Sequence, residues 1–504
     1  MRRNMMKVMT TILTFMMLFS MVGCSKKEGK STNVDTNESQ VKENDGQTEK
    51  TYPKVTWYIR PSAQQDMDIV VEELNKIFRE KVGAELEIKR VDPGDYNQKM
   101  MTTIAAGEKF DMMHSAPRYG FYDNVAKGAY LPLDDLLKEY APKTYANIKS
   151  EFWDAVKVDG KIYGVINYQI FGRENGFRVR KDVYDALDLS SKEIKTFEDM
   201  DEILVKMAEI ADGDDIVFNM NKEGLFNNSL TYHGLDPIDN DMGVIRIGDN
   251  KPVAENRYAT EEFKAYVNMM HKWYKSGYIP KDSPTREYSR EFVATGRIMA
   301  SWDNHKPGDE YEVNTLYGTE MEYIPSETPF VNTQNVIATM TSLSHTSPNP
   351  EKAMQILELV NTDPEVYNLL INGIEGKHYK KVGDNRIEPI SNSGYAPNCG
   401  WMVGNQFNAY LLPGQPDDVW EKTIEVNESA TISSAMGLSI DITSVKNEYV
   451  QCKSVLDEYL PALVTGAVDA DKHLSDMLDK LEQAGIQKII DEENRQIQEF
   501  LSAQ

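Results

Sequence analysis

Residues 54–113 alternate between strand-like and helix-like segments, and no other feature of the sequence restricts the fold as much. The stretch 54–60 (KVTWYIR) is rich in β-branched and aromatic residues, as strands are. Residues 66–82 then place apolar side chains at helical spacing, and Gly83 follows where a helix commonly ends. The pattern continues with a second strand, a second helix and a third strand, at 86–88, 96–106 and 110–113. Strand, helix, strand, helix, strand predicts a parallel sheet with right-handed crossovers, and hence an α/β fold.

Several later segments carry helix start signals. Thr196 followed by Asp199 forms a capping box, which predicts a helix to about residue 211. Asparagine or aspartate followed by proline predicts further helix starts at 349–350 and 363–364. Helical patterns also cover 260–275 and 474–501, and loops are predicted over most of 213–258 and 376–418.

The N-terminus has the pattern of an export signal. Arg2, Arg3 and Lys7 are basic, and residues 8–23 (VMTTILTFMMLFSMVG) form an apolar or hydroxylic run. That run is short for a stable membrane span, which needs roughly 20 residues. It ends in Met-Val-Gly before Cys24, which resembles the bacterial lipobox, with Met where that motif usually has Leu.

The lipobox resemblance implies cleavage after residue 23 and diacylation of Cys24, so that 1–23 is a lipoprotein signal peptide. An ordinary cysteine that ends a plain signal or anchor is the alternative. Residues 24–52 contain almost no aliphatic side chains and cannot bury enough apolar area to fold. They are predicted to be a disordered tether.

Composition narrows the class of partner. The 504 residues allow two to four domains. Lys and Arg number 55 and Asp and Glu number 80, a net charge of −25, which argues against nucleic acid and against basic attachment to anionic lipid. Seven His and three Cys leave little material for a metal cluster or a disulfide framework, and no cofactor is expected. Cys399 and Cys452 could pair, but two buried free thiols are the favoured interpretation.

The exported part resembles an extracellular solute-binding lipoprotein of an ABC importer, of the large sugar-binding type. Six local patterns carry the resemblance in the order expected for that family. They are IAAGEKFD (104–111), YLPLD (130–134), DGKIYG (159–164), VRKDV (179–183), TGRIMASW (295–302) and GIEGKHY (373–379). One departure is Asn167, which falls near a position where the family usually has Pro. The last pattern is similar to a signature of a roughly 500-residue subgroup with an extra C-terminal conserved region.

This resemblance implies a two-lobed periplasmic-binding-protein-like α/β fold with an interlobe cleft and additional C-terminal helices. Lobe 1 would comprise 53–165 plus 335–385, lobe 2 would comprise 166–330 plus 390–450, and a helical extension would cover 451–504. Hinge crossings are expected near 163–167 and 330–337. The implied protein is a monomer on the outer face of the cell membrane, held there by its lipid anchor. It would pass a small solute, expected to be an oligosaccharide, to ABC permease subunits.

Sugars present apolar C–H faces and hydroxyl rims, so a sugar cleft needs aromatic platforms beside polar side chains. By resemblance, the aromatic residue that follows the strand over 297–302 stacks on the sugar, which selects Trp302, with Asp303 beside it as a hydrogen-bond acceptor. Core packing is the alternative for Trp302. At the end of the first strand, Trp57, Tyr58 and Arg60 are candidates, with a solvated arginine as the alternative for Arg60.

Three further groups of candidates lie where the chain passes from strands into loops. Tyr119 follows the third strand and could act as a platform. Tyr168, Arg173 and Glu174 lie just past the first expected hinge crossing, with a surface salt bridge as the alternative. The stretch 398–407 (NCGWMVGNQF) suits a cleft loop and contributes Trp401, Asn405 and Phe407, with a plugged surface loop as the alternative.

Enzyme motifs are missing from the sequence. It contains no G-x-S-x-G, no H-E-x-x-H, no P-loop and no C-x-x-C. A secreted glycoside hydrolase stays open, because it needs only two carboxylates across a sugar cleft. An adhesive or sensory sugar-binding lipoprotein is a further alternative. The sequence leaves open which solute is bound, its size and linkage, and the role of the C-terminal region.

Overall fold

The first sheet has five strands in the order β2-β1-β3-β14-β6 in the computed structural model, which describes residues 51–239 and 241–503. Its strands are β1 (Lys54–Ile59), β2 (Glu85–Arg90), β3 (Met112–Ser115), β6 (Val165–Ile166) and β14 (Met340–Leu343). β1 pairs in parallel with β2 and with β3, as predicted, and β14 runs antiparallel to its neighbours. The third strand begins two residues later than the sequence pattern indicated.

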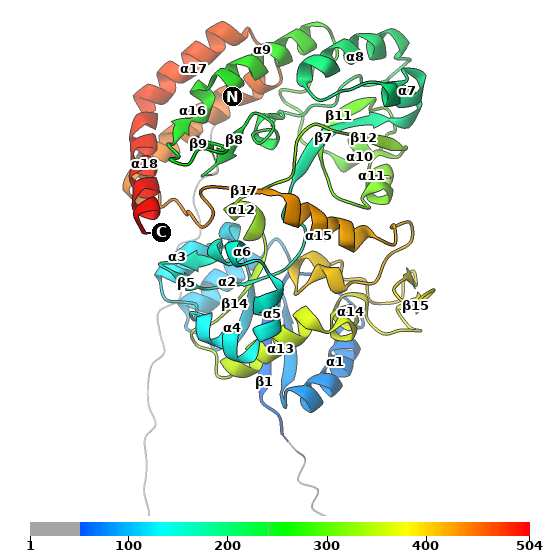
Figure 1. Ribbon diagram of the computed structural model, residues 1–504, viewed down its shortest axis with the longest axis vertical. Coiled ribbons are helices and arrows are strands. Elements are labelled where there is room, and N and C mark those ends of the chain that lie inside the picture. The colour runs from blue at the N-terminus through cyan, green and yellow to red at the C-terminus, as the bar shows by residue number, and fades with distance from the viewer. Residues whose placement is uncertain (1–50, 240, 504) are drawn as a thin grey trace, which may run out of the picture. The chain divides into compact units, whose positions relative to one another are not determined.

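Helices cover this sheet and bury their apolar faces on it (Figure 1). They are α1 (Met67–Lys81), α2 (Tyr96–Ala105), α3 (Phe121–Ala126), α4 (Asp134–Tyr140), α5 (Pro142–Asn147), α6 (Ser150–Asp154), α13 (Pro350–Thr362) and α14 (Pro364–Asn372). Val70, Leu74 and Phe78 lie on the buried face of α1, as the helical spacing predicted. The start of α14 is confirmed, because the carboxylate of Asp363 accepts hydrogen bonds from two backbone N–H groups of the first turn.

A second core surrounds a three-stranded antiparallel sheet in the order β11-β7-β12. Its strands are β7 (Glu174–Arg180), β11 (Ala300–His305) and β12 (Met321–Pro325), and a second small sheet consists of β8 (Leu235–Pro237), β9 (Gly243–Arg246) and β10 (Glu255–Asn256). The helices of this region before residue 320 are α7 (Lys181–Ala186), α8 (Phe197–Ile210), α9 (Glu261–Lys275), α10 (Arg290–Val293) and α11 (Glu310–Tyr317). The predicted capping box of Thr196 and Asp199 is present at the start of α8.

We name the two cores lobe 1 and lobe 2. The buried residues of lobe 1 run from Val55 to Phe171 and from Val331 to Met436, and those of lobe 2 run from Phe177 to Ile324 and from Ala435 to Ile497. The predicted boundary near residue 390 is therefore wrong. Residues 395–409 belong to lobe 1, because Tyr395, Cys399 and Met402 pack into its core.

The chain passes between the two cores three times. The first link, 167–173, joins β6 to β7, slightly later than the expected 163–167. The second contains β13 (Phe330–Val331) and α12 (Thr333–Val336) and leads into β14. The third follows α15 (Val419–Ser429), contains β17 (Thr431–Ile432) and leads to the C-terminal helices, and β17 pairs in parallel with β13.

The C-terminal helices pack on lobe 2, where α16 (Lys446–Val464) and α17 (Ala470–Ala484) lie beside α9 (Figure 1). The helical prediction over 474–501 is confirmed, although the segment is not one continuous helix. It is divided into α17 and α18 (Ile486–Ala503) at Gly485, whose φ of 95° lies in the left-handed region that favours glycine.

Two short hairpins complete the described strands: β4 (Lys157–Val158) with β5 (Lys161–Ile162), and β15 (Tyr379–Lys381) with β16 (Ile387–Pro389). The predicted signal peptide, Cys24 and nearly all of the predicted tether lie outside the described residues. Within the described part of the chain, no helix combines the length and apolarity that a membrane crossing needs. Cys399 and Cys452 are free and buried, which confirms that expectation.

Candidate functional site

The largest cavity among those described, of about 600 Å³, is lined by residues from both lobes, and we call it the main cleft. Lobe 2 contributes the loop after β11 and helix α11, while lobe 1 contributes the end of α14 and the segment 398–415. The first crossing segment contributes Gln169 and Ile170. This arrangement places the main cleft beside a segment that connects the lobes, where ligands of two-lobed proteins commonly bind.

Aromatic side chains form much of the lining of the main cleft. They are Tyr311, Tyr367, Trp401, Tyr410 and Trp420. The indole N–H of Trp420 donates to the carbonyl of Ala409 at 2.8 Å, and the Tyr367 hydroxyl donates to the carbonyl of Gly400 at 2.8 Å. Because the Trp420 N–H is already paired within the protein, its ring offers mainly an apolar face to a ligand, whereas Tyr367 has no exposed surface.

Amide side chains line the same cavity. They are Gln169, Asn372, Asn398, Gln406 and Gln415. An amide both donates and accepts hydrogen bonds, so it matches the hydroxyl groups of a sugar without requiring a charge on the ligand. The main cleft thus combines flat apolar rings with neutral polar groups, the composition predicted for a carbohydrate site.

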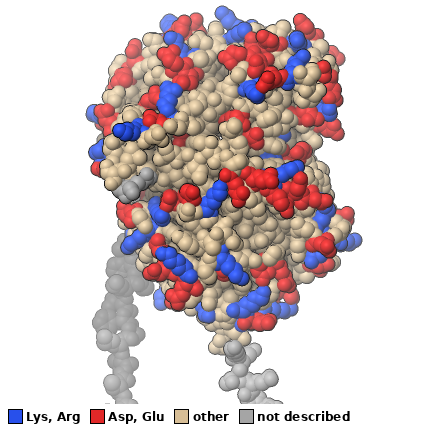
Figure 2. Space-filling view, in the orientation of Figure 1, with Lys and Arg blue, Asp and Glu red and all other residues tan. Residues whose placement is uncertain are grey.

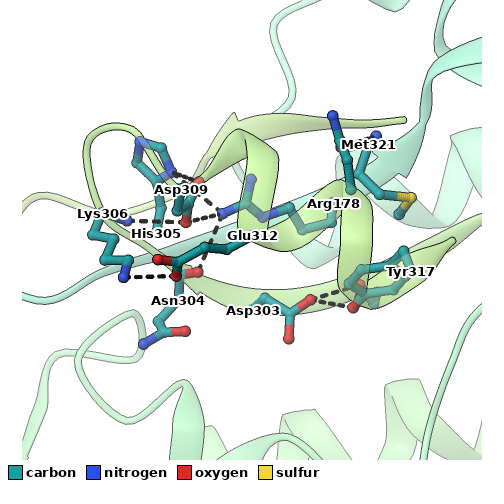
Figure 3. A network of polar contacts seen from close by, with 11 residues as sticks. Arg178, Asp303, Asn304, His305, Lys306, Asp309, Glu312, Tyr317 and Met321 are labelled. Carbon is teal, nitrogen blue, oxygen red and sulfur yellow. Dashed lines mark hydrogen bonds and ion pairs between the residues drawn. The ribbon is translucent and has the colours of Figure 1, made fainter. Parts of the chain in front are cut away.

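The lobe 2 wall of the main cleft is held by a buried ion pair. Figure 3 shows Arg178 of β7 reaching Asp309, at 2.5 Å between Nη2 and Oδ2, and both side chains are almost fully buried. The backbone N–H of Lys306 donates to the same carboxylate at 3.2 Å. The Lys306 ammonium then pairs with Glu312 at 2.8 Å. This network orders the turn that presents Lys306 and Glu312 to the cleft.

Three of the predicted residues, Arg60, Tyr119 and Trp401, meet at one end of the lobe 1 sheet. Arg60 follows β1 and Tyr119 follows β3, so both lie at the carboxyl ends of parallel strands. The guanidinium carbon of Arg60 lies 5.3 Å from the ring centre of Tyr119 and 5.0 Å from that of Trp401. Trp401 also lines the main cleft, so it joins this cluster to the cavity.

His114 forms the floor of the same cluster. Its ring contacts those of Tyr119 and Trp401 edge-on, with centroids 5.6 and 6.1 Å apart. Burial, with the charges of Arg60 and Arg118, lowers the pKa of His114 to about 3. The imidazole is therefore neutral at physiological pH, and arginine supplies the positive charge of the cluster.

Tyr168, Asn405 and Phe407 also come together. The Tyr168 and Phe407 rings contact edge-on, with centroids 4.8 Å apart. The backbone of Tyr168 forms a parallel bridge with Asn405, so the first crossing segment is fastened to the loop that carries Trp401. These three residues border the lining of the main cleft, to which their neighbours Gln169 and Gln406 belong.

Trp302 and Asp303 do not face the main cleft. The prediction that Trp302 follows its strand is wrong, because β11 begins at Ala300. Trp302 is 5% exposed and packs on the rings of Phe177 and Phe197. Asp303 is also enclosed and accepts hydrogen bonds from Ser301 and Tyr317 (Figure 3).

The remaining candidates lie apart from the main cleft. Trp57 has no exposed surface and packs in the lobe 1 core, which gives it no route to a ligand. Tyr58 is half-buried and contacts Phe110. Arg173 is exposed and lines a separate cavity of about 270 Å³, and Glu174 at the start of β7 pairs through its backbone with His305.

Several cleft residues were not singled out from the sequence, notably Tyr311, Tyr410, Trp420 and Lys306. Lys306 and Pro307 directly follow the Trp302–His305 stretch, so an accurate end for β11 would have indicated them. The helical pattern of α15 would have indicated Trp420. No local pattern distinguishes Tyr311, which is 64% exposed, from an ordinary surface tyrosine.

Acidic side chains cover much of the exterior. Figure 2 shows them spread over one face and gathered over α15, which carries the exposed carboxylates of Glu421, Glu425 and Glu428. In the main cleft, basic side chains outnumber acidic ones, because its charged lining residues are Arg290, Lys306 and Glu312. The net charge of −25 therefore describes the surface rather than this cavity.

Comparisons with known proteins agree with this architecture. The family described as bacterial extracellular solute-binding protein matches residues 61–366, and a domain of unknown function, DUF3502, matches residues 434–502. The chain is 27% identical over 458 residues to a carbohydrate ABC transporter substrate-binding protein of Streptococcus pneumoniae serotype 4, a match that covers 89% of this chain and 91% of that protein. It is 21% identical over 361 residues to the polygalacturonan/rhamnogalacturonan-binding protein YtcQ of Bacillus subtilis, covering 66% and 68% of the two chains.

Solved structures show the same similarity. The N-glycan transport solute-binding protein NgtS of Streptococcus pneumoniae superposes with a TM-score of 0.79 at 25% identity, over 89% of this chain and 99% of that one. The structure of NgtS in complex with Man1GlcNAc superposes with a TM-score of 0.68 at 26% identity, over 89% and 100% of the two chains. The two-lobed fold predicted from the sequence is thereby confirmed.

Proposed function

This chain belongs to the family of bacterial extracellular solute-binding proteins, and from that membership we propose that it captures an oligosaccharide outside the cell and delivers it to an ABC permease. The observation that carries the proposal is the lining of the main cleft, where four accessible aromatic rings lie among five amide side chains. The relatives named above as carbohydrate-binding and N-glycan-binding proteins support the same substrate class.

Affinity in such a site comes from sugar rings stacked on aromatic faces and from hydroxyl groups paired with amides. Specificity follows from the cost of leaving a buried amide unpaired when the wrong sugar binds. Trp401 and Trp420 are the aromatic platforms in this proposal, and Gln169 and Asn398 are polar partners.

Delivery requires that the bound and free proteins differ in shape. The three crossing segments are a natural hinge, because a few residues there can absorb a rotation of one core relative to the other. Ligand that contacts both walls of the main cleft would favour the closed arrangement, and the permease would recognise that arrangement.

We further propose that the ligand leaves chemically unchanged. A glycoside hydrolase needs two carboxylates on opposite sides of the scissile bond. Among the described residues that line the main cleft, Glu312 is the one carboxylate, and it is neutralised by Lys306 at 2.8 Å. This composition favours a binding protein over the hydrolase alternative.

The lipid anchor at Cys24 belongs to the proposal as well. A Cys24→Ser variant expressed in a Gram-positive host should move from the membrane fraction into the medium. Retention of this variant in membranes would show that another element holds the protein there.

The function is tested by isothermal titration of the purified full-length protein with a panel of glycans and peptides, followed by chromatography of the recovered ligand. We expect saturable binding of at least one oligosaccharide and its recovery at the original length. Binding restricted to peptides, or recovery of shortened sugars, would overturn the proposal.

A further inference from the structure

Arginines at and beside the main cleft are unusual in lacking acidic partners. Among the described residues, Arg60, Arg118 and Arg290 have neither an ion pair nor a side-chain hydrogen bond, although acids outnumber bases in the chain by 80 to 55. Arg290 lines the main cleft, and Arg118 lines a neighbouring cavity of about 400 Å³.

The position of Arg60 is the most informative. Its guanidinium group lies between the rings of Tyr119 and Trp401, and its Nε atom is buried without a hydrogen-bond partner. Burial lowers the pKa of Arg60, and the nearby charge of Arg118 lowers it further, yet an arginine stays protonated in proteins. A partly desolvated cation without an anion is unfavourable, so this geometry suits a site that a ligand completes.

Arg118 approaches the same platform. Its guanidinium carbon lies 5.0 Å from the Tyr119 ring centre, against 5.3 Å for that of Arg60. Two cations on one tyrosine repel each other, and an anion bound between or beside them would remove that repulsion. The carboxyl ends of β1 and β3 hold both side chains at the edge that Trp401 connects to the main cleft.

We propose that the oligosaccharide carries a negatively charged substituent, a carboxylate or a sulfate, which binds Arg60 and Arg118 while its ring stacks on Trp401. This inference rests on the proposed function and specifies its substrate class. Guanidinium groups pair with such anions through two parallel hydrogen bonds, which adds geometric selectivity to charge. The acidic exterior would disfavour non-specific association of the same ligand, so attraction is confined to the cluster.

The test uses the full-length protein and matched probes that differ in charge. The pairs are trigalacturonate with its methyl ester, 3′-sialyllactose with lactose, and 6′-sulfated lactose with lactose. We expect at least one acidic member to bind ten-fold or more tightly than its neutral partner, and its affinity to fall as salt is raised. The carboxylated and sulfated probes distinguish the two sources of charge.

Variants then identify the residues. Arg60→Gln should abolish the preference for the acidic member, and Arg118→Gln should reduce it. Arg60→Lys should restore part of the preference, because lysine keeps the charge but not the planar fork. Arg297→Gln is the matched control and should change nothing, since Arg297 precedes β11, at the opposite end from the cleft loop, and pairs with Asp214.

Melting temperature separates binding from folding. Because Arg60 lacks an acidic partner, Arg60→Gln should melt at the wild-type temperature or above it without ligand. Two results together would assign Arg60 a structural role and overturn the inference. These are a large drop in the melting temperature of Arg60→Gln and an unchanged preference for the acidic probe in Arg118→Gln. If the neutral probes bind as tightly as the acidic ones or more tightly, the inference fails but the proposed function stands. If no glycan binds at all, both the inference and the proposed function fail.

Discussion

Arg178 donates a hydrogen bond of 2.5 Å to Asp309 in the core of lobe 2, where the two side chains are 1% and 5% exposed. The same Nη2 atom lies 3.3 Å from Nδ1 of His305 and 3.4 Å from the carbonyl oxygen of Asn304. One arginine thus fixes the turn that brings Lys306 to the main cleft, which couples the packing of lobe 2 to ligand binding.

Removal of one partner of this pair should be costly. Arg178→Leu leaves Asp309 buried without its cation, and the free energy of unfolding should fall by about 3–5 kcal/mol in urea denaturation. Arg297→Leu, which breaks an exposed pair with Asp214, should cost less than about 1 kcal/mol. Equal losses in the two variants would mean that the buried pair does not organise the turn.

Two of the three tryptophans named as candidates from the sequence, Trp302 and Trp401, should behave differently when they are replaced. Trp302→Ala removes a ring packed between Phe177 and Phe197, so the free energy of unfolding should fall by about 3–5 kcal/mol with little change in the Kd of folded protein. Trp401→Ala should weaken glycan binding by about ten-fold or more and change stability less. Titration calorimetry measures the affinity of both variants and chemical denaturation measures their stability. Loss of affinity without loss of stability in Trp302→Ala would show that Trp302 contacts the ligand.

Stability should depend on pH through Glu327. Burial raises the pKa of this carboxyl from 4.5 to about 7, although Thr231 and Asn175 donate hydrogen bonds to it. The native state therefore binds this proton more tightly than the unfolded state does. The protonated Glu327 therefore contributes to the free energy of unfolding fully below about pH 4.5, and this contribution is lost as the pH rises through 7. The loss is at most about 3 kcal/mol.

Denaturation of wild type and Glu327→Gln at several pH values measures this contribution as a difference. The stability of wild type relative to the variant should decline between pH 4.5 and 7, because glutamine does not titrate. Glu322→Gln, at a 41% exposed position of β12, serves as the control and should follow wild type. A difference that stays constant with pH would contradict the assignment.

In the GIEGKHY segment (373–379), replacement of Gly373 by alanine should destabilise the protein more than replacement of Gly376. Gly373 has a φ of 79°, and a Cβ there would lie 2.3 Å from Nδ1 of His378, which accepts a hydrogen bond from Ile374. Gly373→Ala should therefore cost about 3 kcal/mol or more, from strain and overpacking together. A Cβ at Gly376 meets nothing within 4 Å, so Gly376→Ala should cost only the backbone strain of its φ of 78°, about 1 kcal/mol. Similar melting temperatures would contradict this.

The features predicted correctly from the sequence are those that depend on residues close together in the chain. Spacing along α1, the capping box at Thr196 and the proline at the start of α14 each depend on neighbours within a few residues, and all three match the structure. Gly485 carried equally local information, but the continuous apolar spacing on both sides of it concealed the break.

The site depended on contacts that no local pattern contains. Arg60 and Trp401 are 341 positions apart, and their stacking arises because the segment after α14 folds back over the carboxyl end of β1. An error of a few residues in the start of β11 was enough to place Trp302 in the cleft instead of the core. Contacts between distant segments therefore form the site, whereas the periodicity of the sequence was enough to predict the helices and strands.

The two free thiols lie in different cores, Cys399 in lobe 1 and Cys452 in lobe 2, and burial raises their pKa values to about 12 and 11. Neither is a ready nucleophile, and neither needs a covalent partner for its lobe to form. Maturation of the described part of this chain therefore requires no oxidoreductase, and it should reach the same native state whether it is refolded with dithiothreitol or in air.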